Sequence, residues 1–286
     1  MPFTRRSCLK AAVTGLAAPL IPLRAMGWVA DTEMTPLDVG IGTFCYHVLS
    51  IDDMVAELKA VLPGNGGRHQ QIEMSLESFM LLSHPHEDLF RATREKLDQA
   101  GIRCVSYYAA TIQNDGDIVA AIVFAKLLGA SNITGEGAIG PDLLKTIDRR
   151  VTAAGLTFAL HNHFVKGGRF PYQSPDEILA ALQPLSESCG AAADTGHFAA
   201  CGYDTVDAIR RLGPRLKIVH LKDVKAVGDG TNVVLGTGIA RIAEVEKQLR
   251  IQRFRHLAAI EYDQEGAGDV LAIMRKNVQY AVSLGV

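Results

Sequence analysis

From residue 37 to the C-terminus, short apolar runs alternate with longer stretches that have helical periodicity. The first apolar run, LDVGIGTFCY, is followed by SIDDMVAELKAVL, in which Ser50 is a suitable helix N-cap. An apolar run followed by a capped, periodic stretch predicts a strand and then a helix. The same order recurs along the rest of the chain, up to the final pair FRHLAAIEYD and GDVLAIMRKNVQYAVSLG.

Eight such strand–helix units follow one another. The predicted strands end near Cys45, Glu73, Tyr108, Gly135, His161, Asp194, His220 and Glu261. Strands that alternate with helices form parallel sheets, and eight units in about 250 residues match a (β/α)8 barrel. The alternative, a doubly wound open sheet, usually carries a G-x-G-x-x-G turn after its first strand, and GIGTF lacks that form. We therefore predict an α/β fold, a single-domain (β/α)8 TIM barrel, over residues 36–286.

The N-terminal segment has a different pattern. Arg5 and Arg6 precede an apolar stretch over residues 11–23, and small residues follow it. This order is typical of a signal peptide, and the paired arginines resemble the twin-arginine export signal, although Cys8 stands where that signal usually has Phe. The apolar stretch has about 13 residues, whereas a spanning helix needs about 20, so we expect no permanent membrane anchor. We predict a signal peptide over residues 1–30 and a periplasmic or secreted protein; an amphipathic N-terminal helix is the alternative.

Composition narrows the classes of partner. The formal net charge is -2, 48% of the residues are hydrophobic, and no long run of Lys or Arg occurs. A nucleic-acid-binding surface normally needs a concentrated positive charge, so we expect no nucleic acid partner. The sequence predicts a small-molecule ligand instead, and it is compatible with a homo-oligomer.

Charged and polar side chains stand at the ends of the predicted strands. They are Glu73, His161, His163, Asp194, His197, His220, Lys222, Asp223, Glu261 and Asp263. Active sites of (β/α)8 barrels lie at this carboxyl face. One such histidine or glutamate is more often structural, but four successive strands that end in His, Asp, His and Glu make a mixed set of donors for a divalent metal. A cation would also offset the repulsion between crowded carboxylates.

Four short motifs occur in a characteristic order. They are HNH at residues 161–163, D-T-x-H at 194–197, H-x-K-D at 220–223 and E-x-D at 261–263, with a GTG turn at 236–238. Together they resemble the xylose isomerase-like sugar (phosphate) isomerase/epimerase superfamily, over the whole chain after the signal. The resemblance implies a divalent ion, Mn, Mg, Co or Zn. The ligands that it implies are His161, Asp194, His220 and Glu261.

One position departs from the ketose 3-epimerases of this superfamily. Those enzymes have a glutamate after strand five, which pairs with the strand-eight glutamate across the substrate, whereas His161 occupies that place here. Two opposed carboxylates can remove a proton from one face and return it to the other. With only one of these carboxylates, the sequence favours isomerisation, dehydration or β-elimination of a keto-sugar over simple epimerisation.

The resemblance also suggests roles for the other residues. Glu261 is the expected proton acceptor, and Lys222 would neutralise a developing oxyanion. His163 and His197 would hold sugar hydroxyls or act as the acid, and Glu73 would orient another hydroxyl.

The choice between two histidines stays open. Because side chains alternate along a strand, His161 and His163 lie on the same face, and either could be the ligand. Glu136, after strand four, is a reserve ligand.

These observations predict a metal-dependent isomerase, epimerase or lyase that acts on a sugar or keto-sugar through an enediolate. No basic phosphate clamp is evident, which favours a free or glycosidic sugar. A non-catalytic exported sugar-binding protein is one alternative. An endonuclease IV-like zinc nuclease is another, but it would have an Asp-x-His pair before the GTG turn, and Asp229 is followed by no histidine there.

Overall fold

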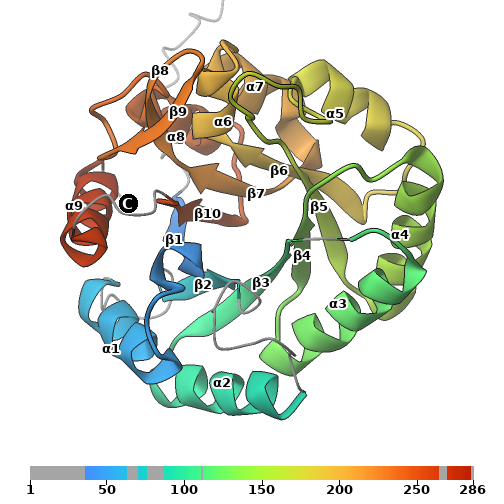
Figure 1. Ribbon diagram of the computed structural model, residues 1–286, viewed down its shortest axis with the longest axis horizontal. Coiled ribbons are helices and arrows are strands. Elements are labelled where there is room, and N and C mark those ends of the chain that lie inside the picture. The colour runs from blue at the N-terminus through green and yellow to red at the C-terminus, as the bar shows by residue number, and fades with distance from the viewer. Residues whose placement is uncertain (1–35, 63–69, 76–86, 111, 264–268, 285–286) are drawn as a thin grey trace, which may run out of the picture. The chain divides into compact units, whose positions relative to one another are not determined.

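The computed structural model describes residues 36–62, 70–75, 87–110, 112–263 and 269–284. Residues Met34–Val286 form one compact unit, and the predicted signal peptide at 1–30 lies outside the described residues. Within this unit, eight parallel strands close into a barrel surrounded by helices (Figure 1). The predicted (β/α)8 barrel is therefore confirmed.

The barrel strands are β1 (Asp38–Gly42), β2 (Gln71–Met74), β3 (Arg103–Ala109), β4 (Asn132–Gly135), β5 (Thr157–His161), β6 (Cys189–Asp194), β7 (Leu216–Leu221) and β10 (Leu257–Ile260). Each pairs with its neighbours in chain order, and β10 closes the ring against β1. The helices are α1 (Ile51–Val61), α2 (Glu87–Gln99), α3 (Asp115–Leu128), α4 (Pro141–Ala154), α5 (Pro175–Leu182), α6 (Thr195–Ala200), α7 (Thr205–Leu212), α8 (Ile242–Ile251) and α9 (Val270–Ser283).

Local signals in the sequence set several of the helix ends. The hydroxyl of Ser50 accepts a hydrogen bond from the backbone N–H of Asp53, as the predicted N-cap of α1 requires. Pro141 is the first residue of α4, where its missing N–H costs nothing, and Gly155 ends that helix with a positive φ of 71°.

Two segments differ from the expected pattern. The first strand ends at Gly42 rather than near Cys45, because the chain turns there into a short 3-10 helix over Thr43–Tyr46. After β7, the chain forms an antiparallel hairpin of β8 (Asp223–Ala226) and β9 (Asp229–Val233) before it reaches α8. Gly228, with φ of 75°, provides the left-handed conformation for the tight turn of this hairpin.

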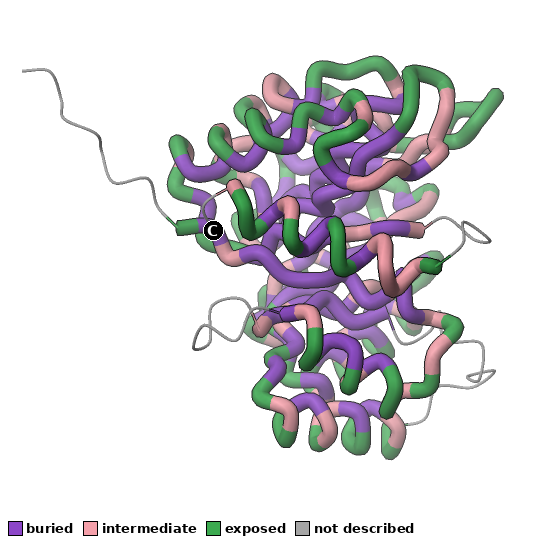
Figure 2. Tube along the Cα trace, turned by 90° about the vertical axis from the view of Figure 1, so that its left-hand side faces the viewer, coloured by how far each residue is buried: buried purple, intermediate pink, exposed green. Residues whose placement is uncertain are grey.

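The core has two parts, which follow from the alternation of side chains along each strand. The large cluster packs the outward side of the strands against the helices, and the tube in Figure 2 is mostly buried through this layer and exposed on the outer turns of the helices. A small separate cluster consists of Ala159, Ala192, Ile218, Leu257 and Ala259. Because these residues alternate with members of the large cluster, they face the barrel interior. Among the described residues, no helix combines the length and the apolar character needed to span a membrane.

Candidate metal centre and active site

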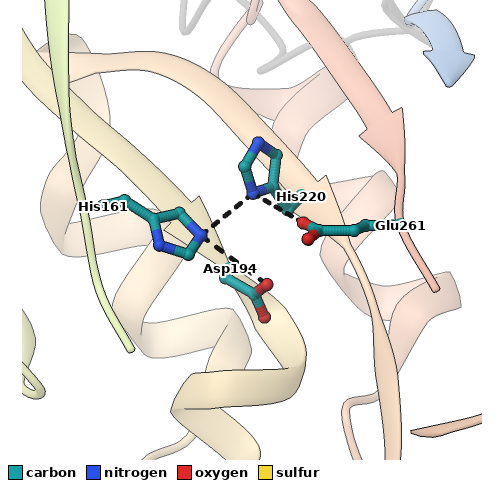
Figure 3. A group of neighbouring side chains, drawn as sticks. All are labelled: His161, Asp194, His220 and Glu261. Carbon is teal, nitrogen blue, oxygen red and sulfur yellow. Dashed lines mark hydrogen bonds and ion pairs between the residues drawn. The ribbon is translucent and has the colours of Figure 1, made fainter. Parts of the chain in front are cut away.

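Each of the four predicted metal ligands stands two residues after an inward-facing residue of the small cluster. His161 follows Ala159, Asp194 follows Ala192, His220 follows Ile218, and Glu261 follows Ala259. Since side chains two apart share a face of a strand, all four point into the carboxyl mouth of the barrel. Figure 3 shows the four side chains converging, and one ligand atom from each lies within 4.8 Å of all the others.

The two histidines lie at the centre of this group. Nε2 of His161 is 3.0 Å from Nδ1 of His220 and 3.8 Å from Oδ2 of Asp194. Nδ1 of His220 is also 2.8 Å from Oε2 of Glu261 (Figure 3). All four side chains are nearly inaccessible to solvent, with Glu261 the most exposed at 11%.

Glu73 determines which nitrogen of His220 faces this centre. Its Oε2 lies 2.7 Å from Nε2 of His220, and its Oε1 accepts hydrogen bonds from Ser106 and Thr134. Since the carboxylate can only accept, Nε2 carries a proton, and Nδ1 is the nitrogen that faces Glu261 and the centre.

The donor set fits a divalent cation. An imidazole lone pair 2.8 Å from a carboxylate oxygen requires a proton or a metal ion between them. Oδ2 of Asp194 and Oε2 of Glu261 are both buried, and the groups that face them are nitrogens, Nζ of Lys222 at 3.0 Å and Nδ1 of His220 at 2.8 Å. Burial alone would lower the pKa of His220, but Glu261 and Glu73 raise it well above the usual value. The site therefore attracts positive charge, and two imidazoles with two carboxylates suit a transition metal.

Asp194 has two tasks in the structure. As the N-cap of α6, its Oδ1 accepts from the backbone N–H of His197 at 2.8 Å, which leaves Oδ2 for the centre. The side chain of Asn162 holds the backbone of Asp194 from the other side, accepting from its N–H and donating to its carbonyl. These contacts hold the backbone of Asp194 in place at the junction of β6 and α6.

Lys222 is buried behind the centre rather than on the cavity wall. Its Nζ lies 2.8 Å from Asp263, 3.0 Å from Asp194 and 3.5 Å from Glu261. Burial alone would lower the pKa of Lys222, but these three carboxylates raise it well above the usual value. Burial alone would raise the pKa of Glu261, but Lys222 and His220 hold it far below the usual range. Glu261 is thus ionised at neutral pH.

A cavity opens beside the candidate centre, and two of the four ligands, His161 and Glu261, line it. Its described lining consists of Gly42, Thr43, Phe44, Glu73, Ser75, Tyr108, Ala110, Glu136, His161, His163, His197, Glu261 and Asp263. The lining combines carboxylates and imidazoles with an aromatic wall, and no described lining residue is Lys or Arg.

His163 and His197 lie ring to ring, with centroids 4.1 Å apart. Burial, together with the nearby His161, lowers the pKa of His163. Burial also lowers the pKa of His197 well below the usual value, although Asp194 opposes this. Both rings are therefore neutral near pH 7. Lys222 donates to Nε2 of His197 at 3.2 Å, which requires that neutral form.

The structure thus brings nine of the ten predicted strand-end residues into one site. The exception is Asp223, whose carboxylate accepts backbone N–H groups of Gly236, Gly238 and Ala240 and so holds the GTG turn. Lys222 does not line the cavity, so its contact with substrate remains a prediction, as do the roles proposed for Glu73, His163 and His197. His161 rather than His163 lies within the ligand group.

Sequence reasoning did not assign a role to Tyr108. It stands at the predicted end of strand three and lines the cavity, where burial and the nearby Glu136 raise its pKa well above the usual value. In the sequence this tyrosine stands near the end of the run IRCVSYYA. An aromatic residue at the end of a strand usually belongs to the hydrophobic core, so the pattern gave no sign of a role in the site. Glu136, predicted as a reserve ligand, lies outside the four-residue group, 3.4 Å from Nδ1 of His161.

Fold and site together define a (β/α)8 barrel with a candidate metal centre of two histidines and two carboxylates at its carboxyl mouth. Residues 51–281 match the family model described as xylose isomerase-like TIM barrel. The chain belongs to that family, and the resemblance seen in its motifs is confirmed. No curated protein matches the chain.

Solved structures with the same fold include three proteins that carry a specific name. The probable 3-DHS dehydratase AsbF of petrobactin synthesis from Bacillus anthracis is 13% identical, with a TM-score of 0.66 over 86% of this chain and 99% of its own. The IolI protein, solved with a zinc atom, is 14% identical, with a TM-score of 0.67 over 87% and 98%. An L-ribulose 3-epimerase is 16% identical, with a TM-score of 0.66 over 87% and 94%. At such low identity these likenesses show the fold alone.

Proposed function

We propose that the protein is a metal-dependent enzyme that removes a proton next to the carbonyl of an uncharged sugar or keto-sugar. One observation carries the proposal: of the two carboxylates in the ligand group, Glu261 also lines the cavity. A group in that position can contact the substrate at the edge of the centre. The relatives named above include a dehydratase and an epimerase, which supports chemistry of this type.

The ligands would be His161, Asp194, His220 and Glu261. A divalent cation, when bound there, would polarise the substrate's carbonyl oxygen and so acidify the neighbouring C–H. Two imidazoles favour Mn, Co or Zn over Mg, which prefers oxygen ligands.

The chain's own residues would handle the proton. Glu261, ionised at neutral pH, takes the proton from the carbon and an enediolate results. Lys222 places its buried positive charge 3.5 Å from Glu261 and offsets the negative charge that the reaction develops nearby. His163 and His197, both neutral, bind hydroxyl groups as donor or acceptor. Return of the proton to the adjacent carbon, together with transfer of a hydroxyl proton between the two oxygens of the enediolate, gives isomerisation. Elimination results instead when a β-hydroxyl takes up the abstracted proton and leaves as water.

The substrate would carry no phosphate. The described cavity wall contains four carboxylates and no Lys or Arg, so a phosphate dianion would be repelled. A free or glycosidic keto-sugar has the hydroxyl groups that this wall can hydrogen-bond.

The test is metal analysis of the purified protein, followed by a panel of neutral and phosphorylated keto-sugars in D₂O. NMR would detect exchange of the proton next to the carbonyl. We expect stoichiometric metal, exchange with a neutral sugar, and loss of exchange in chelator. Protein that contains no metal and keeps its activity in chelator would contradict the proposal.

We also propose export by the twin-arginine route, from the paired arginines at positions 5 and 6. Replacing both by Lys should retain the precursor inside the cell, as fractionation and immunoblotting would show. Normal export of the double variant would reject this assignment.

A further inference from the structure

The two nitrogens of the His161 ring have different surroundings. Nε2 faces the candidate metal centre, 3.0 Å from Nδ1 of His220. Nδ1 points away from the centre, to Oε2 of Glu136 at 3.4 Å. Both Nδ1 and this oxygen are buried, and neither has a hydrogen-bond partner of good geometry in the described part of the chain. A small rotation of either side chain would join them in a hydrogen bond.

Glu136 has Tyr108 as a second neighbour. It follows β4 directly, and its carboxylate interacts with the hydroxyl of Tyr108 in the lining of the same cavity. The ring of Tyr108 packs edge-on against the ring of His161, with centroids 5.7 Å apart and an interplanar angle of 79°. Tyr108, Glu136 and His161 thus form a chain of contacts from β3 to β5.

His220 shows the opposite arrangement. Its Nε2 contacts the carboxylate of Glu73 at 2.7 Å, and its Nδ1 faces the centre. Each histidine of the centre therefore has a carboxylate behind it, but the nitrogen that remains for the metal differs. His161 presents Nε2, and His220 presents Nδ1.

We propose that Glu136 is the positioning residue of His161: it accepts the Nδ1 proton and thereby reserves the Nε2 lone pair for the metal. Glu73 does the same for His220 with the nitrogens exchanged. A carboxylate behind a ligating imidazole fixes its tautomer and raises its basicity. In the ketose 3-epimerases a glutamate follows strand five, whereas His161 stands there in this chain. Glu136 would supply, close to the centre, the negative charge that His161 lacks. The inference rests on the metal centre of the proposed function.

The first test reads the nitrogens directly. Full-length protein labelled with ¹⁵N-histidine would be loaded with ¹¹³Cd²⁺, and long-range ¹H–¹⁵N spectra would separate protonated from metal-bound ring nitrogens. His161→Asn and His220→Asn variants assign the signals. We expect cadmium coupling to Nε2 of His161, with its Nδ1 protonated, and to Nδ1 of His220. Coupling to Nδ1 of His161, or to neither of its nitrogens, would overturn the proposal.

The second test removes the carboxylate. Glu136→Ala should weaken Cd²⁺ and Zn²⁺ binding by about 10- to 100-fold, as loss of such a partner typically does. Glu136→Gln keeps an acceptor oxygen without the charge, so its affinity should lie between those of wild type and Glu136→Ala. Glu187→Gln, on an exposed residue, is the matched control and should bind as wild type does. Wild-type affinity and an unchanged His161 tautomer in Glu136→Ala would reject the inference. Should that variant not fold, the same comparison with Glu136→Gln decides.

These results separate the inference from the proposed function. Metal binding that depends on Glu136, without proton exchange in any carbohydrate, would refute the function alone. If the Glu136 variants bind metal and exchange the substrate proton as the wild type does, the inference alone is refuted. A wild-type protein that binds no divalent ion would overturn both.

Discussion

Nζ of Lys222 lies 3.0 Å from Oδ2 of Asp194, and both side chains are inaccessible to solvent. The same Nζ also contacts Asp263 and Glu261, so one buried cation lies against three carboxylates at the barrel mouth. Removing one partner of a buried ion pair leaves an uncompensated charge, which costs more than the pair itself contributes. The charge balance of the site therefore depends on Lys222 whenever no metal ion is bound.

Lys222→Met should destabilise the metal-free protein strongly. We expect the free energy of unfolding to fall by about 3–5 kcal/mol, and added divalent metal to recover part of this loss by supplying positive charge. Denaturant unfolding in chelator and in excess metal measures both effects. Lys145→Met, in an exposed pair with Asp142, is the control and should change the stability by less than about 0.5 kcal/mol. A Lys222→Met protein as stable as wild type in chelator would contradict the prediction.

Substitutions at Asp194 can separate metal binding from helix capping. Asp194→Asn retains an oxygen for the N–H of His197 but loses the negative charge that faces Lys222, so it should bind metal poorly and lose the stability that this buried ion pair supplies. Asp194→Ala should also lose the metal, and its stability should lie about 1 kcal/mol below that of Asp194→Asn because the cap is missing as well. Isothermal titration with Zn²⁺ and denaturant unfolding of the metal-free variants give the two readouts. Stoichiometric metal in Asp194→Ala would remove this residue from the ligand set.

Glu261→Gln tests the proposed base. The amide keeps the size and hydrogen-bonding capacity of the side chain but cannot accept the proton. We expect the reaction rate to fall by about 10² to 10⁴-fold, and exchange of the substrate proton with D₂O to fall in parallel. Because Gln is also a poorer metal ligand, metal content must be measured in the same sample. A fully metallated variant that exchanges at the wild-type rate would assign the base to another residue, with His163 the first candidate.

Glu246 should make stability depend on pH, far from the candidate centre. Burial in α8 raises its pKa from the usual 4.5 to about 7, although Arg250, at 3.6 Å, opposes the shift. A raised pKa means that the folded state binds the proton more tightly than the unfolded chain. The stabilisation is therefore complete below pH 4.5 and is lost as the pH rises to about 7, and it amounts to roughly 3 kcal/mol.

Glu246→Gln should remove this dependence and exceed the wild-type stability at pH 8. Unfolding by urea between pH 4.5 and 8 measures the slope. Glu244→Gln, on the exposed face of the same helix, should keep the wild-type slope. Parallel curves for wild type and Glu246→Gln would show that the buried carboxyl does not titrate in this range.

The sequence by itself determined the barrel and the mouth at which the four candidate ligands stand. Strand–helix alternation is a local signal, and alternation along a strand places residues two apart on one face. Because all eight strands run in the same direction, their final polar residues must meet at one mouth. The motifs HNH, D-T-x-H, H-x-K-D and E-x-D must therefore lie together at the carboxyl mouth of the barrel.

The tertiary structure alone decided what surrounds those ligands. Glu73 and His220 are 147 residues apart in the chain, and only barrel closure brings them within 2.7 Å. The same is true of Glu136, whose Oε2 lies 3.4 Å from Nδ1 of His161. Asp223 was predicted to belong to the site, but its carboxylate accepts hydrogen bonds from the backbone of the GTG turn instead. A one-dimensional pattern records which face a side chain occupies, whereas its hydrogen-bond partner depends on the distances that the closed barrel sets.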